Sequence, residues 1–472
     1  MLKNIENLIE EKKYAEIKKI LNEMNDYDIA EIFEDLPTTE QLKIFRLLTK
    51  DIAADVFSYM ETDTQSKLIT LLSEKEAVEI INDMASDDAA DLMDEIPANV
   101  VSRLLNKVDP EARRDINQLL NYPDDSAGSI MTTEYMDLKE ENTIEEAIRK
   151  IKREYDDKET IDICFVTDKS RKLIGTVKLK DLVLNDEEKL IKDIMDDDIM
   201  SVNTLMDQEE VASIIQDYDL TSIPVVDTEN KLVGIITIDD VIDIIEAEAT
   251  EDIEKMAAIT PTEKPYLKLN VLELYKSRIP WLLLLMISAT FTGKIIQHYE
   301  AALASYVVLT SFIPMLMDTG GNAGGQSSVT IIRGLSLNDI EYKDTLKVIW
   351  KEIRVAVLAG LTLAIANFAK LLLIDKVTTS VALVVCLTLV VTVIIAKIIG
   401  CSLPILAKKI GFDPAVMASP FITTIVDAIS LIVYFQIATH LLGIYKYFHK
   451  LKYSFFIFKF HIYAANDLAI VL

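Results

Sequence analysis

One carboxylate lies near the middle of the last strongly apolar run of the chain. The run Asp413–Phe435 reads DPAVMASPFITTIVDAISLIVYF and contains Asp427. A charge at mid-bilayer costs about 2.5–3.5 kcal/mol even on lenient insertion scales, so such residues usually face a bundle interior or a watery cavity. Ser419, Thr423 and Asp427 are spaced by four residues and therefore share one stripe of a helix. This stripe predicts the lining of a hydrophilic path.

An intramembrane ion pair is the alternative role for Asp427. Lys294, Lys370 and Lys397 each lie in or beside an apolar segment and are candidate partners. Long lysines near the ends of such segments more often extend to the interface. The pathway interpretation is therefore favoured over the ion pair.

Charge is divided unevenly along the 472 residues. Residues 1–270 hold 31 Lys and Arg against 65 Asp and Glu, whereas residues 271–472 hold 17 against 11. An acidic half of this kind repels nucleic acid and attracts cations. Cys164, Cys386 and Cys401 show no paired spacing, which argues against a disulfide framework or a thiolate metal site. The start MLKNIENLIEEKK has no signal-peptide core, so the acidic half is expected in the cytoplasm.

Residues 1–128 show apolar residues at spacings of three and four, which predicts successive helices. MNDYDIAEIFEDLP (Met24–Pro37) recurs as MASDDAADLMDEIP (Met84–Pro97). Each copy is expected to form an Asp-capped helix that ends at a proline or polar turn. Stacked helix pairs in a small superhelix follow from this repeat.

Residues 129–242 contain a second repeat, in which Phe165–Leu182 matches Pro224–Val241. Each copy predicts strand, turn, strand and an acid-initiated helix. The repeat resembles a pair of CBS modules, in which the G-x-x-[ST]-x-x-D pattern often holds the phosphate and ribose of a nucleotide. The second copy supplies Gly234, Thr237 and Asp240, whereas the first has Lys178 in place of the hydroxyl. The resemblance therefore implies at most one intact site for a ligand such as ATP.

Residues 243–272 are expected to form an acidic connecting helix. Its carboxylates repel one another at helical spacing unless something neutralises them. Clustered carboxylates suit hard cations such as Mg²⁺ and Ca²⁺, although a plain solvated connector has the same pattern. The acids that crowd its polar faces are Asp243, Glu246, Glu248, Glu251 and Asp252.

Residues 273–444 predict a membrane domain of five spans. Basic residues concentrate in the loops after the second and fourth spans, so both loops and the acidic half are expected in the cytoplasm. The tail 445–472, rich in aromatic residues and lysine, fits no single topology. The expected spans are Ile279–Ile296, Leu303–Met317, Val355–Ile374, Val381–Ile399 and Ala415–Leu442.

The second span runs into MDTGGNAGGQSS (Met317–Ser328), an unusual composition for a membrane segment. Four glycines around Asn322 allow either close helix approach or irregular backbone against protein or water. In the second case, backbone carbonyls would join Asn322, Gln326 and Ser327 as neutral oxygen ligands. Both interpretations stay open on the sequence.

The order of domains, with TGGNAGGQS (Thr319–Ser327) and DPAVMASPFITTIVD (Asp413–Asp427), is similar to that of the MgtE family of magnesium channels. The resemblance implies a homodimer in the cell (inner) membrane, with one pore lined by the second and fifth spans. Its pore residues would be Asp427, Thr423, Asn322 and Ser419. It also implies closure by cytosolic Mg²⁺ at Asp87, Asp91, Asp207, Glu209, Asp219, Asp240, Asp243, Glu248, Glu251 and Asp252.

The sequence gives less support to other functions. H-E-x-x-H and G-x-x-x-x-G-K-[ST] are both absent, which argues against an intramembrane metalloprotease and an ATP-driven pump. A secondary transporter that exchanges Mg²⁺ against Na⁺ or H⁺ is the alternative, because Asp427 could carry a proton. A membrane-anchored nucleotide sensor would require Asp427 to be merely structural.

Overall fold

The computed structural model describes residues 2–262, 264, 266–417 and 419–443. Its internal contacts divide the chain into two compact units, residues 1–246 and 247–472, and each is described by itself. The tail 445–472, for which the sequence favoured no topology, lies outside the described residues.

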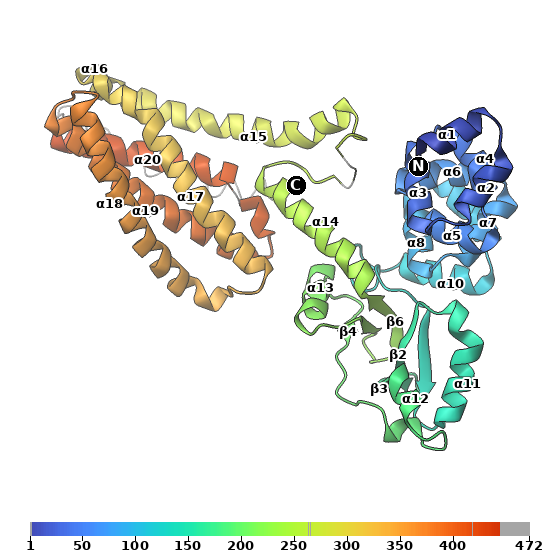
Figure 1. Cartoon of the computed structure of the whole chain (residues 1–472). Coiled ribbons are helices and arrows are strands. Elements are labelled where there is room, and N and C mark those ends of the chain that lie inside the picture. The colour runs from blue at the N-terminus through green and yellow to red at the C-terminus, as the bar shows by residue number, and fades with distance from the viewer. Residues whose placement is uncertain (1, 263, 265, 418, 444–472) are drawn as a thin grey trace. The chain divides into compact units, whose positions relative to one another are not determined.

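The first unit begins with the predicted all-helical domain (Figure 1). The two copies of the sequence repeat form equivalent helices, α3 and α8. Their caps differ from the expected Asp: the Asn25 side chain accepts from the Tyr27 backbone N–H, and Ala85 precedes α8 without a side-chain cap. The helices are α1 (Leu2–Glu10), α2 (Tyr14–Leu21), α3 (Asp26–Asp35), α4 (Thr38–Phe45), α5 (Lys50–Ser58), α6 (Thr62–Leu71), α7 (Glu74–Asp83), α8 (Ser86–Glu95), α9 (Ala98–Leu105) and α10 (Pro110–Leu119).

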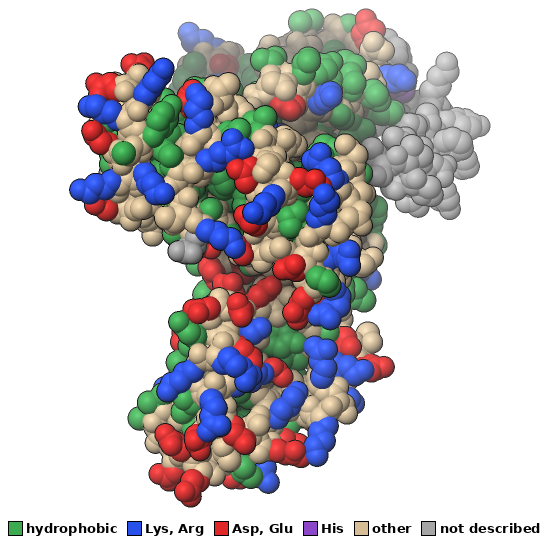
Figure 2. Space-filling model, turned by 90° about the vertical axis from the view of Figure 1, so that its right-hand side faces the viewer, with side chains coloured by type: hydrophobic (Ala, Val, Ile, Leu, Met, Phe, Trp, Pro, Cys, Tyr) green, Lys and Arg blue, Asp and Glu red, His purple; other side chains and the backbone are tan. Residues whose placement is uncertain are grey.

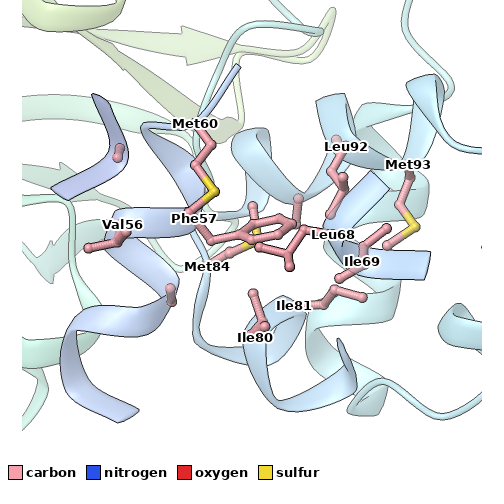
Figure 3. Packing of buried hydrophobic residues seen from close by; sticks show 14 of the residues in the cluster. Val56, Phe57, Met60, Leu68, Ile69, Ile80, Ile81, Met84, Leu92 and Met93 are labelled. Carbon is pink, nitrogen blue, oxygen red and sulfur yellow. The ribbon is translucent and has the colours of Figure 1, made fainter. Parts of the chain in front are cut away.

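Successive helix pairs bury their apolar faces against their neighbours. Helix α5 packs on α7 and α6 packs on α8, so Phe57, Leu68, Ile81 and Leu92 meet in one continuous core (Figure 3). Phe57 and Leu68 are fully buried. Stacking of this kind is what the sixty-residue repeat predicts, because no single helix pair buries its apolar face alone.

The CBS-type repeat folds as two three-stranded sheets with matching topology. In each sheet the first two strands are parallel and the last two antiparallel. The alternating α/β pattern read from the sequence is confirmed. The elements are β1 (Tyr135–Lys139), α11 (Ile144–Glu154), β2 (Thr160–Thr167), β3 (Leu173–Lys178) and α12 (Leu179–Leu184), then β4 (Val202–Asn203), α13 (Gln208–Asp217), β5 (Ser222–Val226) and β6 (Leu232–Thr237).

Gly175 and Gly234 occupy equivalent places in β3 and β6. A methyl group on Gly175 would lie 3.2 Å from the Asp196 carbonyl oxygen, and one on Gly234 would lie 2.7 Å from the Thr132 carbonyl oxygen. A backbone segment crosses each strand at this point, so a side chain is excluded at Gly234 and would be tightly packed at Gly175.

The acidic connecting helix, α14 (Ile238–Met256), begins and ends earlier than residues 243–272. It starts directly after β6, and the chain after Met256 is not helical up to Val271 among the described residues. Pro261 falls in this stretch, which is consistent with an early end because proline cannot continue a helix.

The second unit is a helical bundle. Among the described residues, four stretches are long and apolar enough to span a membrane: Val271–His298, Tyr342–Leu373, Thr379–Lys409 and Pro414–Leu441. Helices α17, α18, α19 and α20 pack side by side (Figure 1). The elements are α15 (Val271–His298), α16 (Glu300–Ser305), α17 (Ile313–Ser336), α18 (Thr345–Leu373), α19 (Thr379–Lys409) and α20 (Ser419–Leu441).

The expected second span, Leu303–Met317, is wrong in its bounds. Helix α16 ends at Ser305, residues 307–312 form a 3₁₀ segment, and α17 begins at Ile313 with Pro314 in its first turn. Proline suits this position, because a first-turn N–H has no partner within the helix. Helix α17 then runs through the whole glycine-rich stretch to Ser336. The glycine carbonyls therefore belong to a helix, and the irregular-backbone interpretation is not realised.

The glycines of α17 make close helix packing possible. A methyl group on Gly320 would lie 2.8 Å from Thr392 Cγ2 of α19, and one on Gly321 would lie 2.7 Å from Thr423 Cγ2 of α20. One on Gly400 of α19 would lie 2.2 Å from the carbonyl oxygen of Gly324. Helix α17 thus contacts the backbone of α19 directly and packs closely against side chains of α20, as small residues allow in membrane bundles.

Candidate ion pathway and cation-binding surfaces

Helix α17 carries a polar stripe that the described part of the chain leaves uncovered. Asp318, Asn322 and Gln326 are spaced by four residues and are exposed, whereas the glycines on the other side are buried. Asp and Asn are expensive to place against hydrocarbon, so such residues normally face protein or a water-filled cavity. The stripe therefore marks a surface that needs water or a second protein surface.

Asp427 lies on α20 next to this stripe. It is partly buried, and Asp318 is close enough to interact with it electrostatically. Thr423, one turn before Asp427, packs against Gly321, the residue that precedes Asn322. Thr423 donates its hydroxyl proton to the Pro420 carbonyl at 2.9 Å, which leaves its oxygen lone pairs available as an acceptor. Ser419 begins α20, but its side chain lies outside the described residues.

The ion-pair alternative for Asp427 finds no support. Lys397 pairs with Glu352 at 3.3 Å and Lys370 pairs with Asp375 at 3.0 Å. Lys294 is exposed on α15. Over residues 266–417 and 419–443, no Lys or Arg forms a salt bridge with Asp427.

Asp318 is a candidate residue that the sequence reasoning missed. It directly precedes the glycine-rich motif, and its spacing of four from Asn322 was the available signal. Together with Asp427 it brings two carboxylates to the same side of the α17–α20 contact. Mg²⁺ is commonly held by one or two carboxylates while it keeps several waters.

A second acidic site lies in the first unit, between the helical domain and the CBS pair. Figure 2 shows acidic side chains gathered at this junction. The Ser86 hydroxyl of α8 donates to Glu134 Oε2 at 2.7 Å and so links the two domains. Asp87 and Asp88 follow Ser86 on α8, and Asp240 lies near them in the first turn of α14. Asp88 and Glu134 were not among the expected ligands.

Burial and mutual repulsion disfavour the charged form of the carboxylates at this junction. Burial raises the pKa of Asp87 well above its usual range, and Asp88, Asp240 and Glu134 raise it further. Burial also raises the pKa of Asp240 to about 6, with Asp239 and Asp88 adding to the effect. Among the described residues, Asp87 Oδ1 is buried and accepts no hydrogen bond. A buried carboxylate oxygen without a donor, among other acids, is a position that a cation would stabilise.

This electrostatic strain predicts a pH dependence. Acids whose folded-state pKa is raised stabilise the fold at low pH, and that stability is lost as pH rises through the folded pKa. Without Mg²⁺, we expect the α8–β1 junction of the full-length protein to open more and more readily as the pH rises from 4 to 7. The contribution of Asp240 is on the order of 3 kcal/mol. Hydrogen exchange of residues 84–95, corrected for its intrinsic pH dependence, measures this opening.

Two variants and one added ion sharpen this measurement. Asp240→Asn should flatten the pH dependence, whereas Glu210→Gln, at an exposed acid of α13, should leave it unchanged. Added Mg²⁺ should restore protection most strongly at the higher pH. A junction that becomes more protected as pH rises in EDTA would contradict the prediction.

The other expected regulatory residues of the first unit are dispersed and exposed. Asp91 lies one turn after Asp87 on α8, and Asp207 accepts from the Glu209 backbone N–H at 2.9 Å at the start of α13. Asp219 follows α13 in the left-handed backbone region, with φ of 51°. Asp243 is exposed on α14. Their role as Mg²⁺ ligands stays a prediction.

The second half of α14 contacts the helical bundle of the second unit. Asp252 Oδ2 accepts from the Ser336 hydroxyl at 3.2 Å, at the end of α17. Lys255 bridges Glu251 at 2.5 Å and Asp413 at 2.7 Å. Burial and the Asp413 charge raise the pKa of Asp252. Lys255 is therefore held between a carboxylate of its own helix and one from the segment that precedes α20.

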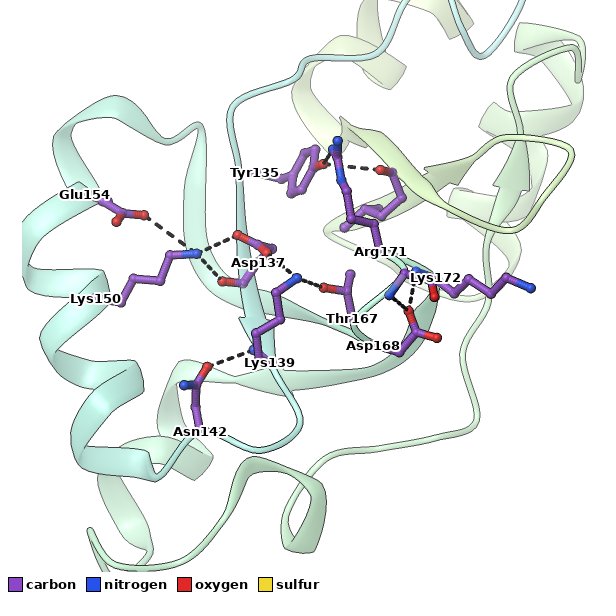
Figure 4. A network of polar contacts seen from close by, with 12 residues as sticks. Tyr135, Asp137, Lys139, Asn142, Lys150, Glu154, Thr167, Asp168, Arg171 and Lys172 are labelled. Atoms are coloured by element: carbon purple, nitrogen blue, oxygen red, sulfur yellow. Dashed lines mark hydrogen bonds and ion pairs between the residues drawn. The ribbon is translucent and has the colours of Figure 1, made fainter.

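Two residues of the expected nucleotide motif, Thr237 and Asp240, are hydrogen-bonded to each other. The Thr237 hydroxyl donates to Asp240 Oδ2 at 2.7 Å. The negative charges of the neighbouring acids would repel a phosphate that is not accompanied by a metal ion. A separate cavity of about 260 Å³ lies at the other end of the strands and is lined by Tyr135, Asp137, Lys139, Thr167, Arg171 and Leu232. Of the two cations that line it, Lys139 pairs with Asp137 at 3.3 Å, and Arg171 donates to the Tyr135 hydroxyl at 3.2 Å (Figure 4).

No group of three or more Asp, Glu, His or Cys side chains converges into a ready metal-binding cluster within the described part of the chain. At the α8–β1 junction, Asp87, Asp88, Asp240 and Glu134 are close enough to interact electrostatically, without forming such a cluster. Such an arrangement suits a hydrated Mg²⁺ better than a tightly coordinated transition metal.

The fold and these sites define a class: a multispan membrane protein with an acidic half that contains a CBS pair. Family comparisons agree with this class. The family MgtE, a divalent cation transporter, matches residues 313–437, and the MgtE intracellular N domain matches residues 24–125. CBS domains match residues 127–187 and 191–247.

Individual relatives are similar over most of the chain. The magnesium transporter MgtE of Bacillus subtilis is 34% identical over 92% of this chain and 95% of its own length. That of Thermus thermophilus is 38% identical over 72% of this chain and 75% of its own length. A crystal structure of the cytosolic domain of the Mg²⁺ channel MgtE with ATP is 33% identical, with a TM-score of 0.50, and covers 52% of this chain and all of that one. The chain belongs to the MgtE family of magnesium transporters.

Proposed function

We propose that this protein is a Mg²⁺-selective channel that admits the ion down its electrochemical gradient into the cytoplasm. The observation that carries the proposal is the uncovered polar stripe of α17 beside Asp427. The stripe offers carboxylate and amide oxygens, which are hard ligands suited to Mg²⁺. Soft ligands are scarce there, because Cys386 and Cys401 are buried within the bundle.

A homodimer is the arrangement that this surface supports best. Asp318, Asn322 and Gln326 are exposed in one protomer, although α17 packs on α19 and α20, which are long and apolar enough to span a membrane. A second copy related by a two-fold axis would turn two such stripes toward each other and keep them away from lipid. The ion path would then run between the two copies of α17 and α20, in the cell (inner) membrane.

Closure by cytosolic Mg²⁺ is supported by the electrostatics of the acidic half. The carboxylates at the α8–β1 junction repel one another, and bound Mg²⁺ would cancel that repulsion and favour a compact state. In the second unit, α14 already touches the end of α17 through Asp252 and Ser336. Mg²⁺ that binds more tightly to the compact state would therefore shift the population toward a closed pore.

ATP is a secondary candidate ligand of the CBS pair. A relative's cytosolic domain is described in complex with ATP. In this chain, the acids near Thr237 and Asp240 would have to be neutralised before a triphosphate could bind there. We therefore propose that ATP, if it binds, does so together with a divalent cation.

Replacing Asp318 should weaken the attraction of cations to the pathway. We expect Asp318→Asn to reduce Mg²⁺ uptake about three- to tenfold at low external Mg²⁺, because loss of one nearby carboxylate weakens cation attraction by on the order of 1 kcal/mol. Saturating Mg²⁺ should largely restore the rate. The measurement is uptake into proteoliposomes over a range of Mg²⁺ concentrations, with Asp339→Asn, outside the helices, as the matched control. Equal half-saturation in the wild type and both variants would remove Asp318 from the pathway.

Electrical recording of the purified protein in liposomes tests the proposed function as a whole. Currents that follow the Mg²⁺ gradient and close as Mg²⁺ rises on the cytoplasmic face would support both the channel and its feedback. Mg²⁺ uptake without resolvable current, dependent on a Na⁺ or H⁺ gradient, would instead identify a coupled exchanger.

A further inference from the structure

A buried polar contact joins three helices of the membrane unit. The Ser327 hydroxyl of α17 donates to Glu352 Oε2 of α18 at 2.6 Å, and Lys397 Nζ of α19 donates to the same oxygen at 3.3 Å. The Lys397 and Glu352 side chains are only 9% and 13% exposed, and Ser327 is buried. We refer to Ser327, Glu352 and Lys397 as the three-helix lock.

The lock lies away from the candidate pathway. Ser327 is five positions after Asn322, which places the two side chains about 140° apart around α17. The lock therefore touches the face of α17 that packs on α18 and α19, whereas the polar stripe lies on another face. Ser327 therefore faces away from an ion held by Asn322.

A gain in stability would not by itself explain why Glu352 and Lys397 form a buried ion pair here. Two buried charges lose their hydration, and replacing such a pair with apolar residues of similar size is often neutral or stabilising. Ionisable residues inside membrane bundles are rare and usually functional. Where buried ion pairs have an established benefit, they fix the register of one element against another.

Helix α17 needs such a register device. Gly324 and Gly400 bring the α17 and α19 backbones into direct contact, and glycine has no side chain that interlocks with its neighbour. Ser327 lies three residues after Gly324, and Lys397 three residues before Gly400, so the lock is one turn from this bare contact. A slip of α17 by one turn moves it about 5.4 Å and separates Ser327 from Glu352. It would also move Asp318 and Asn322 relative to Asp427 on α20.

We propose that Glu352 and Lys397 are positioning residues for ion selectivity, which they act on by fixing the register of α17 against α18 and α19. This proposal rests on the proposed function, because it assigns α17 and α20 to the ion path. A hydrated Mg²⁺ is recognised by the spacing of oxygens around it, so a displaced α17 alters discrimination between Mg²⁺ and the larger Ca²⁺.

The test uses the double variant Glu352→Met with Lys397→Met in the full-length protein. Removing both charges together avoids an unpaired buried charge, so we expect a thermal midpoint close to that of the wild type. The ratio of Mg²⁺ to Ca²⁺ uptake into proteoliposomes should nevertheless fall about tenfold, as the loss of a coupled network allows. A double variant with the wild-type ratio and wild-type stability would overturn the proposal.

Two further variants keep the outcome interpretable. Ser327→Ala removes only the α17 end of the lock and should shift the ratio in the same direction, which provides the readout if the double variant does not fold. Asp375→Asn breaks an ion pair with Lys370 whose side chains are 49% and 29% exposed, and it should leave the ratio unchanged. An unchanged ratio in Ser327→Ala would also count against the lock.

The proposed function can fail separately from this inference. If Asp427→Ala keeps wild-type uptake, the pathway itself is wrong, whatever the lock variants do. If Asp427→Ala is inactive while the double variant and Ser327→Ala both discriminate as the wild type does, only the positioning role fails.

Discussion

Replacing Asp427 with alanine should abolish Mg²⁺ uptake, with a loss of at least about a hundredfold relative to the wild type. Asp427 is a partly buried carboxylate on α20 beside the exposed stripe of α17, and Asp318 interacts with it electrostatically. Without it, a hydrated Mg²⁺ would lose its nearest negative charge inside a region of low dielectric. Uptake into proteoliposomes, normalised to folded protein, gives the measurement.

The fold should survive this substitution. No Lys or Arg in the described part of the chain forms a salt bridge with Asp427, so its removal leaves no orphaned cation. Size-exclusion behaviour and the thermal midpoint should match those of the wild type. Asp427→Asn should also be inactive, because an amide keeps the shape and loses the charge. Retained uptake in Asp427→Ala would refute the pathway and favour a structural role or a nucleotide sensor.

Gly400→Ala should strongly destabilise the membrane unit. The added carbon would lie 2.2 Å from the carbonyl oxygen of Gly324, and a backbone atom cannot rotate away as a side chain can. Overpacking typically costs about 1–3 kcal/mol and occasionally more, so α17 and α19 should be forced apart. We expect a lower thermal midpoint, a poorer yield of monodisperse protein, and reduced Mg²⁺ uptake.

Gly293→Ala is the matched control. Gly293 lies inside α15, and a methyl group there meets no atom within 4 Å. Alanine has a higher helix propensity than glycine, so this variant should be as stable as the wild type or slightly more stable. A Gly400→Ala protein with the midpoint and uptake of Gly293→Ala would show that the α17–α19 contact tolerates separation.

Much of the architecture could be predicted from local patterns. The spacing of apolar residues in residues 24–37 and 84–97 is a property of one helix at a time, and α3 and α8 form as expected. The Phe165–Leu182 and Pro224–Val241 repeat likewise determined two sheets of the same topology, because strand alternation and glycine positions act over short distances. Intramembrane charge singled out Asp427 for the same reason: its cost depends only on the apolar residues around it in sequence.

The glycine-rich stretch shows where local patterns end. Its composition allowed either irregular backbone or close helix packing, and the choice depends on whether other helices approach at that point. Helices α19 and α20 do approach, so α17 continues as a helix through all four glycines. The predicted span Leu303–Met317 ended too early, because hydropathy excluded the polar half of α17.

The tertiary structure alone decided which charges are partners. From the sequence, Lys397 was a candidate partner of Asp427, but the helix packing directs it to Glu352, 45 residues earlier in the chain. Asp88 and Glu134 join Asp87 and Asp240 because the helical domain and the CBS pair meet there, a contact between segments far apart in sequence. The sequence by itself determined which residues are costly to bury or to place in a membrane, since that cost is a property of each side chain and its neighbours. Only packing could determine which of these costs are relieved by a partner, and which are left for an ion.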